Sequence, residues 1–415
     1  MKAGMHREDA DMEMKLLAGP IAALALIGAP AYAEISGDVV RIGVLTDMSS
    51  LYADNTGPGN VAATELAIED FGGEVLGKRI ELLTADTQNK PDIGLSVGGR
   101  WLEVEGVDVI AGASASSVTL AVQQLAGQEN KVFLISDAAS SDITGKACNA
   151  NTVHWTYDTA SLANVTGSAV VEAGGDSWFF LTADYAFGYA LERDVTAVVE
   201  AAGGEVLGSV RHPLNSSDFS SFVLQAQSSG AKIVGLANAG GDTVNGIKAA
   251  SEFGLVQGGQ KLAGLLVFVM DIHSLGLDVS QGLQLTEAFY WDQDDESRAF
   301  TERYKKKMDG RVPNSIQAGY YAMITHYLKA VEALGSDGPG DAVVAKMKEL
   351  ETDDPLFGKG HIRVDGRHMH DMYLFEVKAP SESQGPYDYY KLIATVPPEK
   401  AFRPLEEGGC PLVKN

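Results

Sequence analysis

Basic side chains are scarce in this sequence. Lys and Arg number 32 against 56 Asp and Glu, which gives a formal net charge of −24 over 415 residues. A surface this acidic repels nucleic acid and anionic lipid, so we expect neither as a partner. The simplest role of the charge is to keep the protein soluble.

Long apolar runs are also scarce, and one lies near the N-terminus. Met14-Lys15 precedes an apolar stretch over residues 16–29, and Ala31-Tyr32-Ala33 supplies the small residues of a cleavage site before Glu34. The stretch is shorter than the roughly 20 residues of a membrane span. A positive start, a short apolar run and an A-x-A site together predict a secretory signal peptide at residues 1–33.

The segment ahead of that signal is unusual. Residues 1–13 are polar and acidic, which predicts that translation starts at Met12 or Met14. No later run could cross a membrane. We therefore expect an exported, periplasmic and monomeric protein.

Catalytic signatures are absent or incomplete. The sequence has no H-E-x-x-H, no G-x-x-x-x-G-K-[ST], and no G-x-G-x-x-G after a strand, so neither a phosphate cradle nor nicotinamide binding is supported. Residues 112–116 resemble a nucleophile elbow without its closing glycine. His368-Met369-His370 could present metal ligands on one strand face, although a lone His-x-His is more often structural. We predict no enzyme, no cofactor and no metal.

Only two cysteines occur, Cys148 and Cys410. In an oxidising compartment a single pair usually forms a disulfide, which would attach the C-terminal tail to a loop in the first half of the chain. The alternative is two unpaired thiols.

Short apolar runs alternate with helical patterns after the signal. Many runs are continuously apolar, as in strands covered on both faces, and the alternation predicts parallel sheets with helices on both faces. The expected strands are Val39–Leu45, Ile80–Ala85, Val107–Ala111, Val132–Ile135, Ser177–Leu181, Val206–Val210, Lys232–Ala237, Leu262–Val269, Met372–Val377 and Tyr387–Val396. The expected helices are Gly59–Phe71, Ser117–Gln128, Leu162–Glu172, Phe219–Gln227, Thr243–Phe253, Ser297–Lys307, Gln317–Leu334 and Asp341–Glu351.

The alternation falls into two sections, each the size of a doubly wound α/β domain. We predict a first lobe from residues 39–158 plus 289–370, and a second from 159–288 plus 371–396. The section at 289–370 reads as mostly helical and too poor in strands to stand alone. Residues 397–415 would form a tail that the disulfide attaches to the first lobe. Because no Pro/Ser linker or low-complexity segment occurs, we expect lobes joined by chain crossovers.

Small hydroxyls, carboxylates and aromatic side chains follow the predicted strands. Ligands bind beyond the carboxyl ends of parallel strands, and Ser beside a helix N-terminus can hold an anion. Each such segment could instead be only a turn or a helix cap, but six of similar character favour a shared small-molecule site. They are residues 47–54, 114–117, 136–141, 182–188, 238–242 and 270–273.

The ordered set of these motifs resembles the periplasmic branched-chain amino acid binding proteins, which are type I solute receptors of ABC importers. The similarity covers nearly the whole mature chain, and its specificity comes from order and spacing. The matching segments are residues 40–49 (VRIGVLTDMS), 69–73 (EDFGG), 112–117, 184–188 (DYAFG), 218–221 (DFSS) and 249–255.

This resemblance implies two lobes that close on a ligand around a hinge of three crossovers. It further implies that Ser116, Ala138 and Ser140 hold a ligand carboxylate through a hydroxyl and backbone amides. Permease subunits of an ABC importer would be the protein partners.

The second lobe has its own implied contacts. Tyr185 or Phe187 would cover the ligand, and Asp271 would hold an α-ammonium group. Gln317 falls near a wall position that is aromatic in leucine-type members.

The sequence also departs from the family pattern. A second-lobe tyrosine after residues 232–237 is replaced by Asn238-Ala239-Gly240, and the long tail with Cys410 is absent from the best-known members. With the aromatic-rich segments at 157–158, 290–292 and 387–390, these departures make the chain similar to a subgroup that is described only broadly as amino acid binding. Related receptors take up aromatic acids or small amides.

We therefore expect an extracytoplasmic receptor for an amino acid or an aromatic carboxylate. An exported ligand sensor for a membrane signalling receptor is the alternative, as is binding of a small amide. An amidase or esterase, and a DNA-binding regulator of the same fold, are disfavoured. The candidate ligand-binding residues are Ser49, Tyr52, Asp54, Ser116, Ala138, Ser140, Tyr157, Tyr185, Phe187, Asn238, Asp271 and Gln317.

Overall fold

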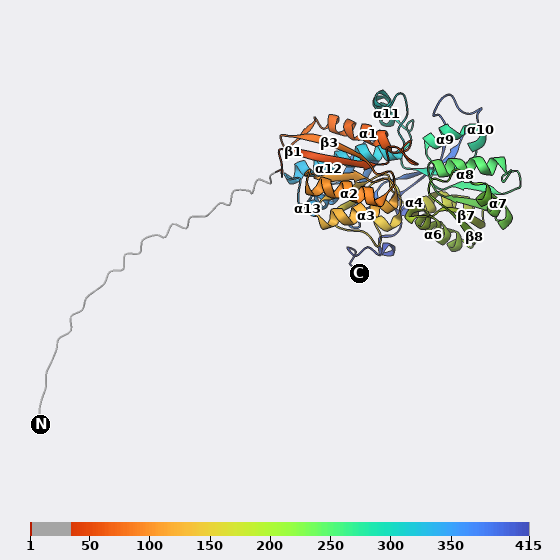
Figure 1. The fold of residues 1–415 in the computed structure, drawn as a ribbon, viewed down its shortest axis with the longest axis horizontal. Coiled ribbons are helices and arrows are strands. Elements are labelled where there is room, and N and C mark those ends of the chain that lie inside the picture. The colour runs from red at the N-terminus through yellow and green to blue at the C-terminus, as the bar shows by residue number, and fades with distance from the viewer. Residues whose placement is uncertain (2–34, 415) are drawn as a thin grey trace. The chain divides into compact units, whose positions relative to one another are not determined.

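Two parallel β-sheets with helices on both faces form the two lobes of this protein (Figure 1). The computed structural model describes Met1 and residues 35–414. The predicted signal peptide and the predicted start site lie outside the described residues. Two doubly wound lobes are the architecture predicted from the β-α alternation, and that fold class is confirmed.

The first lobe is built on a six-stranded sheet within residues 35–414, in the order β2-β3-β1-β4-β5-β6. Its pairs are parallel except β2 with β3. Gly43 of β1 lets a helix approach closely, because a Cβ there would lie 2.6 Å from the ring of Trp101 on α2. The elements are β1 Val39–Thr46, α1 Gly57–Asp70, β2 Glu74–Val75, β3 Lys78–Asp86, α2 Pro91–Glu103, β4 Val109–Gly112, α3 Ser116–Gln128, β5 Val132–Ile135, the 3₁₀ turn η1 Ser141–Ile143, and β6 Thr152–His154.

The second lobe is built on a parallel sheet of the described chain, in the order β10-β9-β7-β8. A helix precedes it in three consecutive pieces, the middle one with π geometry. The elements are α4 Thr159–Leu162, η2 Ala163–Gly167, α5 Ser168–Glu172, β7 Ser177–Ala183, α6 Ala186–Ala201, β8 Glu205–His212, α7 Ser220–Ser229, β9 Ile233–Ala237, α8 Gly241–Glu252, β10 Lys261–Gly264, α9 Val269–Leu275 and α10 Leu277–Ser280.

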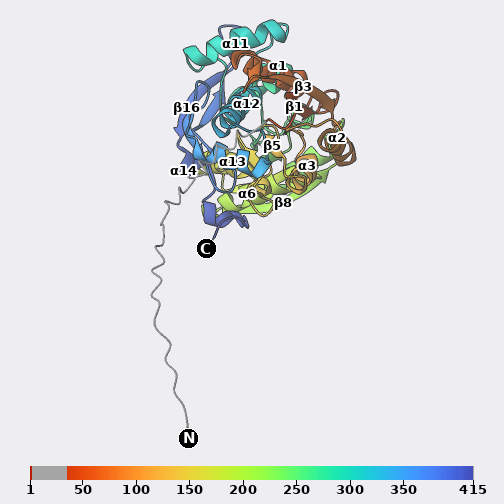
Figure 2. The same cartoon turned by 90° about the vertical axis from the view of Figure 1, so that its left-hand side faces the viewer.

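Three helices return to the first lobe after β11 (Gln284–Glu287): α11 Asp295–Lys307, α12 Ser315–Leu334 and α13 Gly340–Glu349. Lys307 of α11 pairs with Glu65 and Glu69 of α1 at 2.9 and 2.8 Å, and the two helices lie side by side in Figure 2. The section is mostly helical, as expected, and it also contains three short strands that were not predicted. They form a small antiparallel sheet after α13, made of β12 Thr352–Asp354, β13 Gly358–Ile362 and β14 His368–Met369.

A further antiparallel sheet pairs β11 with β15 (Met372–Val377) and β15 with β16 (Tyr390–Val396). β15 has the predicted bounds, whereas β16 begins three residues later than predicted. The chain passes between the lobes before β7, after β11 and before β15, which agrees with the expected hinge of three crossovers.

The expected strand Leu262–Val269 was half wrong. β10 ends at Gly264, residues 265–268 form a buried loop, and Val269 begins α9. A short apolar run marks burial, and burial alone does not distinguish a strand from an inward-facing loop. Helices α2 and α6 had no counterpart among the expected helices, although Phe187, Leu191, Val195 and Val199 of α6 repeat every four residues and are buried.

The tail contains α14 (Pro398–Ala401) and the 3₁₀ turn η3 (Leu405–Gly408), and it is fastened to the first lobe. The predicted Cys148–Cys410 disulfide is present, with its Cα atoms 5.5 Å apart. The guanidinium of Arg403 donates to the carbonyl oxygen of Ser141 at 3.1 Å, so the tail also supports the η1 turn.

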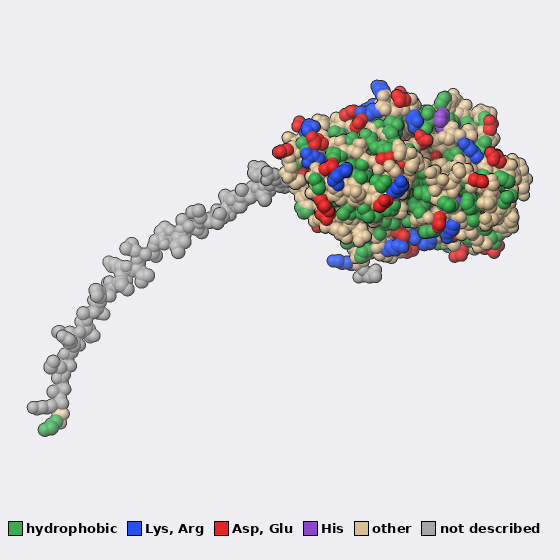
Figure 3. Space-filling model, in the orientation of Figure 1, with side chains coloured by type: hydrophobic (Ala, Val, Ile, Leu, Met, Phe, Trp, Pro, Cys, Tyr) green, Lys and Arg blue, Asp and Glu red, His purple; other side chains and the backbone are tan. Residues whose placement is uncertain are grey.

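Charged side chains of both signs are interspersed over the face shown in Figure 3. Lys and Arg are therefore not gathered there into a basic patch. In the part of the chain that the structure describes, no helix is long and apolar enough to cross a membrane.

Candidate ligand-binding site

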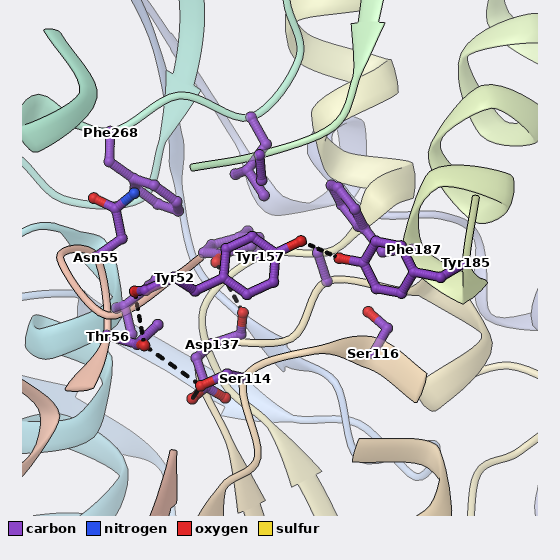
Figure 4. Close-up of a pocket in the computed structure, with 14 residues that line it drawn as sticks. Tyr52, Asn55, Thr56, Ser114, Ser116, Asp137, Tyr157, Tyr185, Phe187 and Phe268 are labelled. Atoms are coloured by element: carbon purple, nitrogen blue, oxygen red, sulfur yellow. Dashed lines mark hydrogen bonds between the residues drawn. The ribbon is translucent and has the colours of Figure 1, made fainter. Parts of the chain in front are cut away.

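Strand ends from both lobes surround a common cavity (Figure 4). Its volume is about 30 Å³, which is space for roughly one or two water molecules. An amino acid therefore fits only if the surrounding side chains or the lobes move apart. The lining residues are Tyr52, Asn55, Thr56, Ser114, Ser116, Asp137, Ala139, Tyr157, Tyr185, Phe187, Ala239, Leu266, Phe268 and Ile316.

The turn after β4 supplies the polar floor of the cavity. Gly112, Ala113 and Ser114 all have positive φ, at 105°, 106° and 53°. For a residue with a Cβ this conformation is costly, and such strain collects at functional sites. Gly112 is required there because a Cβ would meet the Tyr320 hydroxyl and the carbonyl oxygen of Leu45.

Ser116 begins α3, a helix of 13 residues, and it is buried at the cavity. Its hydroxyl accepts a hydrogen bond from the backbone N–H of Ser140 at 3.2 Å. The free N–H groups and the positive dipole end of α3 point toward this position, so it can stabilise a carboxylate.

Asp137 follows β5 and brings a carboxyl group to the cavity. Its Oδ2 accepts hydrogen bonds from the hydroxyls of Ser114 and Tyr320, both at 3.1 Å, and from the amide of Asn60 at 3.4 Å. Its Oδ1 is buried and has no hydrogen-bond partner among residues 35–414. Burial raises the pKa of Asp137 to about 6, although the bonds from Tyr320 and Ser114 oppose the shift.

Aromatic side chains form most of the wall. Tyr157 lies 5.9 Å from Phe268 between ring centroids, and Tyr185 lies 5.9 Å from Phe187. The hydroxyl of Tyr157 donates to the backbone carbonyl of Asp137 at 3.3 Å, so it is not directed at the free carboxylate oxygen. Flat apolar walls with a few fixed polar groups are typical of small-molecule sites.

Two hydrogen bonds join the lobes across the site. The hydroxyls of Tyr52 and Tyr185 are 2.6 Å apart, and burial raises the pKa of both groups. The amide of Asn55 donates to Asp271 at 2.8 Å. These bonds exist only while the lobes are together, so they stabilise the closed arrangement.

Glycine makes the close approach of the lobes possible. Gly240 follows β9 with φ of +57°, and a Cβ there would lie 3.0 Å from the Leu51 carbonyl oxygen and from the Tyr52 ring. The resemblance implied a second-lobe tyrosine where this sequence has Asn238-Ala239-Gly240. In this chain the Tyr52 ring of the first lobe approaches that segment.

The structure brings together five of the candidate ligand-binding residues and places the other seven outside the lining. The five are Tyr52, Ser116, Tyr157, Tyr185 and Phe187. Three of the seven lie in the first-lobe turns: Ser49 donates to Asp86 at 2.5 Å, the carbonyl of Ala138 bonds His154, and Ser140 caps η1. Asp54 is exposed and paired with Arg311, and Gln317 bonds Asn55 and Asn314. In the second lobe, Asn238 bonds His212 and Thr243, and Asp271 bonds Asn55 and the N–H of Phe268.

Several lining residues were not among the candidates. Ser114, Asp137 and Ala139 belong to segments that had been singled out, but they were not chosen as candidates within those segments. Leu266 and Phe268 belong to the apolar run that read as a strand. The missed residues are Asn55, Thr56, Ser114, Asp137, Ala139, Ala239, Leu266, Phe268 and Ile316.

The paired histidines lie elsewhere, in the core of the first lobe. His368 stacks on Trp155 with ring centroids 4.0 Å apart, and His370 bonds the carbonyl oxygen of Thr156 at 2.7 Å. Burial lowers the pKa of His368, and it lowers that of His370 to about 4, so both rings are neutral at neutral pH. Within residues 35–414, no cluster of three or more His, Cys, Asp or Glu could hold a metal ion.

The fold and the cavity define a class: a protein of two parallel-sheet lobes that encloses a small ligand between them. Residues 39–385 match the periplasmic binding protein family, and the chain belongs to that family. Its members are binding proteins rather than enzymes, so the predicted lack of catalysis is confirmed at the level of the family. Membership also indicates a periplasmic location.

Relatives of known sequence and structure share most of the chain. A Leu/Ile/Val-binding protein homologue of Brucella melitensis is 26% identical over 372 residues, which is 88% of this chain and 93% of the relative. A periplasmic binding protein from Burkholderia mallei is 53% identical, with a TM-score of 0.89 over 91% of this chain and 100% of that one. A branched-chain amino acid ABC transporter periplasmic ligand-binding protein from Burkholderia xenovorans is 40% identical, with a TM-score of 0.80 over 90% and 99%.

Proposed function

We propose that this protein is the solute receptor of an ABC importer and closes its lobes on a small carboxylate, either an amino acid or an aromatic acid. The observation that carries the proposal is the cavity itself, which takes residues from both lobes and is buried between them. A ligand held from both sides stabilises the closed state, and closure can then be recognised by a permease. The 40% identical Burkholderia xenovorans protein is itself described as part of an ABC transporter.

The carboxylate end of the ligand would lie at Ser116. The hydroxyl of Ser116 and the first N–H groups of α3 supply donors, and the helix dipole favours negative charge there. Tyr52, Tyr157, Tyr185 and Phe187 would enclose the rest of the molecule.

A thermal-shift screen of the mature chain against amino acids, aromatic acids and small amides tests this function. A ligand that binds only the folded state raises the melting temperature in a concentration-dependent way. A ligand at 100 times its Kd should add about 2.7 kcal/mol to the free energy of unfolding. A complete lack of response across the screen would contradict the proposed function.

Export and partners form the remaining part of the proposal. The leader pattern at residues 14–33 supports export by a signal peptide, and the mature chain would act as a monomer with the permease. The N-terminal sequence of the secreted protein and its mass by light scattering test these two points.

A further inference from the structure

The η1 turn of the first lobe lies between the C-terminal tail and helix α6 of the second lobe. Ser141, the first residue of η1, is fully buried and bonds both neighbours. Its carbonyl oxygen accepts a hydrogen bond from Nη2 of Arg403 in the tail at 3.1 Å, and its hydroxyl donates to Asp194 of α6 at 2.7 Å. The tail and α6 are therefore linked through a single buried residue.

The tail is packed against the backbone of this turn as well as joined to it covalently. The Cys148–Cys410 disulfide attaches it a few residues beyond η1. Between them, Gly145 permits a close approach, because a Cβ there would lie 2.8 Å from the carbonyl oxygen of Gly408 and 3.0 Å from Nη2 of Arg403. The position of the turn and the position of the tail are therefore coupled.

Helix α6 binds the other side of the turn through charged groups. Arg193 donates through Nη1 to Asp142 at 3.1 Å and through Nη2 to the hydroxyl of Ser141 at 2.8 Å. Its Nε donates to Asp194 at 2.9 Å, which fixes the two α6 side chains relative to each other. The side chains of Asp142 and Asp194 are only 18% and 13% exposed, so water competes less for these bonds than at an open surface. Because they bridge the lobes, they favour the closed form.

The turn also reaches the ligand cavity. Ser140, which precedes η1, donates its backbone N–H to the hydroxyl of Ser116 at 3.2 Å. Ser116 and Ala139 both line the cavity. A displacement of the turn would therefore affect the cavity wall and the contact with α6 together.

A turn of this size depends on its surroundings. η1 has three residues, and 3₁₀ geometry forms weaker internal hydrogen bonds than an α-helix does. Its side-chain cap, from the N–H of Asp142 to the hydroxyl of Ser140, is long at 3.3 Å. The guanidinium of Arg403 supplies a charged donor to the same turn from outside, and such bonds are stronger than neutral ones.

We propose that the C-terminal tail is a positioning element for lobe closure: it holds η1 in the conformation that receives Arg193 and Asp194 of α6. Arg403 is the positioning residue, and it acts through the carbonyl oxygen of Ser141. This inference goes beyond the proposed function, because it concerns the motion of the lobes whatever ligand they enclose.

Small-angle scattering of the ligand-free protein tests this role through the radius of gyration. Arg403→Met removes the donor and should shift the ratio of closed to open molecules roughly 2- to 10-fold toward the open form, with a larger radius. Arg193→Met removes the contact between the lobes directly and should also enlarge the radius. Arg100→Met is the matched control, because Arg100 pairs with Glu105 inside the first lobe, and it should keep the wild-type radius.

A double variant tests whether the tail acts through the turn. Arg403→Met combined with Arg193→Met should open the protein no further than Arg193→Met alone, because both changes remove the same contact with α6. Additive opening would overturn the proposed route through η1.

The disulfide is tested by Cys148→Ser/Cys410→Ser, which should enlarge the radius in the same direction. Leu328→Ala is its control, since truncation of this buried side chain of α12 also destabilises the protein but leaves the tail in place. Leu328→Ala should keep the wild-type radius, and equal opening in both proteins would overturn the inference.

A wild-type radius in Arg403→Met or in Arg193→Met would also overturn it. If the cysteine variant does not fold, Arg403→Met decides the question, because it keeps the disulfide. No ligand enters these measurements, so a negative result leaves the proposed function intact.

Discussion

The hydroxyl groups of Tyr52 and Tyr185 lie 2.6 Å apart, and each belongs to a different lobe. The bond joins the two lobes beside the cavity. Because it exists only while the lobes are together, we expect the two tyrosines to contribute to the balance between open and closed forms.

Tyr185→Phe should therefore favour the open form of the unliganded protein. One hydrogen bond contributes about 0.5–1.5 kcal/mol net, which corresponds to a shift of roughly 2- to 10-fold in the ratio of closed to open molecules. Small-angle scattering should report a larger radius of gyration. Tyr189→Phe is the control, because Tyr189 bonds Asp184 on the exposed side of α6. The same radius in Tyr185→Phe and wild type would contradict the role of the pair.

Gly240→Ala should weaken ligand binding by hindering closure. A Cβ at this position lies 3.0 Å from the backbone of Leu51 and from the ring of Tyr52, both in the other lobe. Gly276→Ala is the control, since Gly276 has φ of +79° and ψ of 153°, Gly240 has φ of +57° and ψ of −134°, and a Cβ at Gly276 meets nothing within 4 Å. Both positions have positive φ outside the left-handed helical region, so an alanine strains the backbone at each. Only Gly240→Ala should lose affinity in calorimetry; equal losses would point to the backbone cost alone.

Ser116→Ala should weaken binding of a carboxylate ligand by about 1–3 kcal/mol, because a donor at the N-terminus of α3 is lost. Ser117→Ala removes the neighbouring hydroxyl, which does not line the cavity, and should leave affinity unchanged. Titration of the same ligand into both variants makes the comparison. A Ser116→Ala protein with wild-type affinity would exclude this serine as the carboxylate site.

The stability of the unliganded protein should depend on the ionisation of Asp137. Burial raises its pKa to about 6 from 3.8, so the folded state holds this proton more tightly than the unfolded state does. The resulting stabilisation is full below pH 3.8 and is lost as pH rises through about 6, by up to about 3 kcal/mol. Tyr157 and Tyr320 face Asp137, and burial raises the pKa of both, so neither titrates in this window.

Urea denaturation between pH 4 and 7.5 measures this dependence. The free energy of unfolding of wild type should fall relative to that of Asp137→Asn across the range, because the variant lacks the titrating group. Asp271 and Asp242 also have pKa values raised to about 6 and remain in both proteins, so they cancel in the difference. If the free energies of unfolding of wild type and Asp137→Asn changed with pH in parallel, Asp137 would not titrate between pH 4 and 7.5.

Removal of the Cys148–Cys410 disulfide should destabilise the protein by about 2–5 kcal/mol, the usual cost of losing a native disulfide. The double variant Cys148→Ser/Cys410→Ser, compared with wild type with and without reductant, gives the value by denaturation. Reductant should lower the stability of wild type and leave the double variant unchanged. If reductant also lowered the stability of the double variant, the effect of reductant on wild type could not be assigned to the disulfide.

The sequence was a good guide wherever a pattern is local. Continuous apolar runs located β5 and β9 because buried parallel strands need such runs, and β15 has its predicted bounds. The same argument failed at Leu266 and Phe268, which are equally apolar but line the cavity from a loop. Apolar character reports burial, while the identity of the buried element depends on tertiary contacts.

The cavity shows the same limit at the level of single residues. The segments that approach it were identified, since strand ends of a parallel sheet gather at one edge. The choice between Asp137 and Ala138, or between Asn55 and Asp54, depends on which side chain the turn directs inward. Those directions depend on partners more than 100 residues away, Tyr320 for Asp137 and Asp271 for Asn55.

The first lobe is interrupted in the chain by the second, and this has a consequence for the order of folding. Helix α12 packs on α1, and Cys410 joins Cys148 across 262 residues. Because synthesis starts at the N-terminus, all strands of the second-lobe sheet are made before α12. Helix α12 can therefore pack on the first lobe only after the second-lobe sheet is complete. Because Cys410 lies after β16 in the chain, the Cys148–Cys410 bond can form only once all the strands have been synthesised. The disulfide therefore stabilises the assembled lobes rather than directing their early folding.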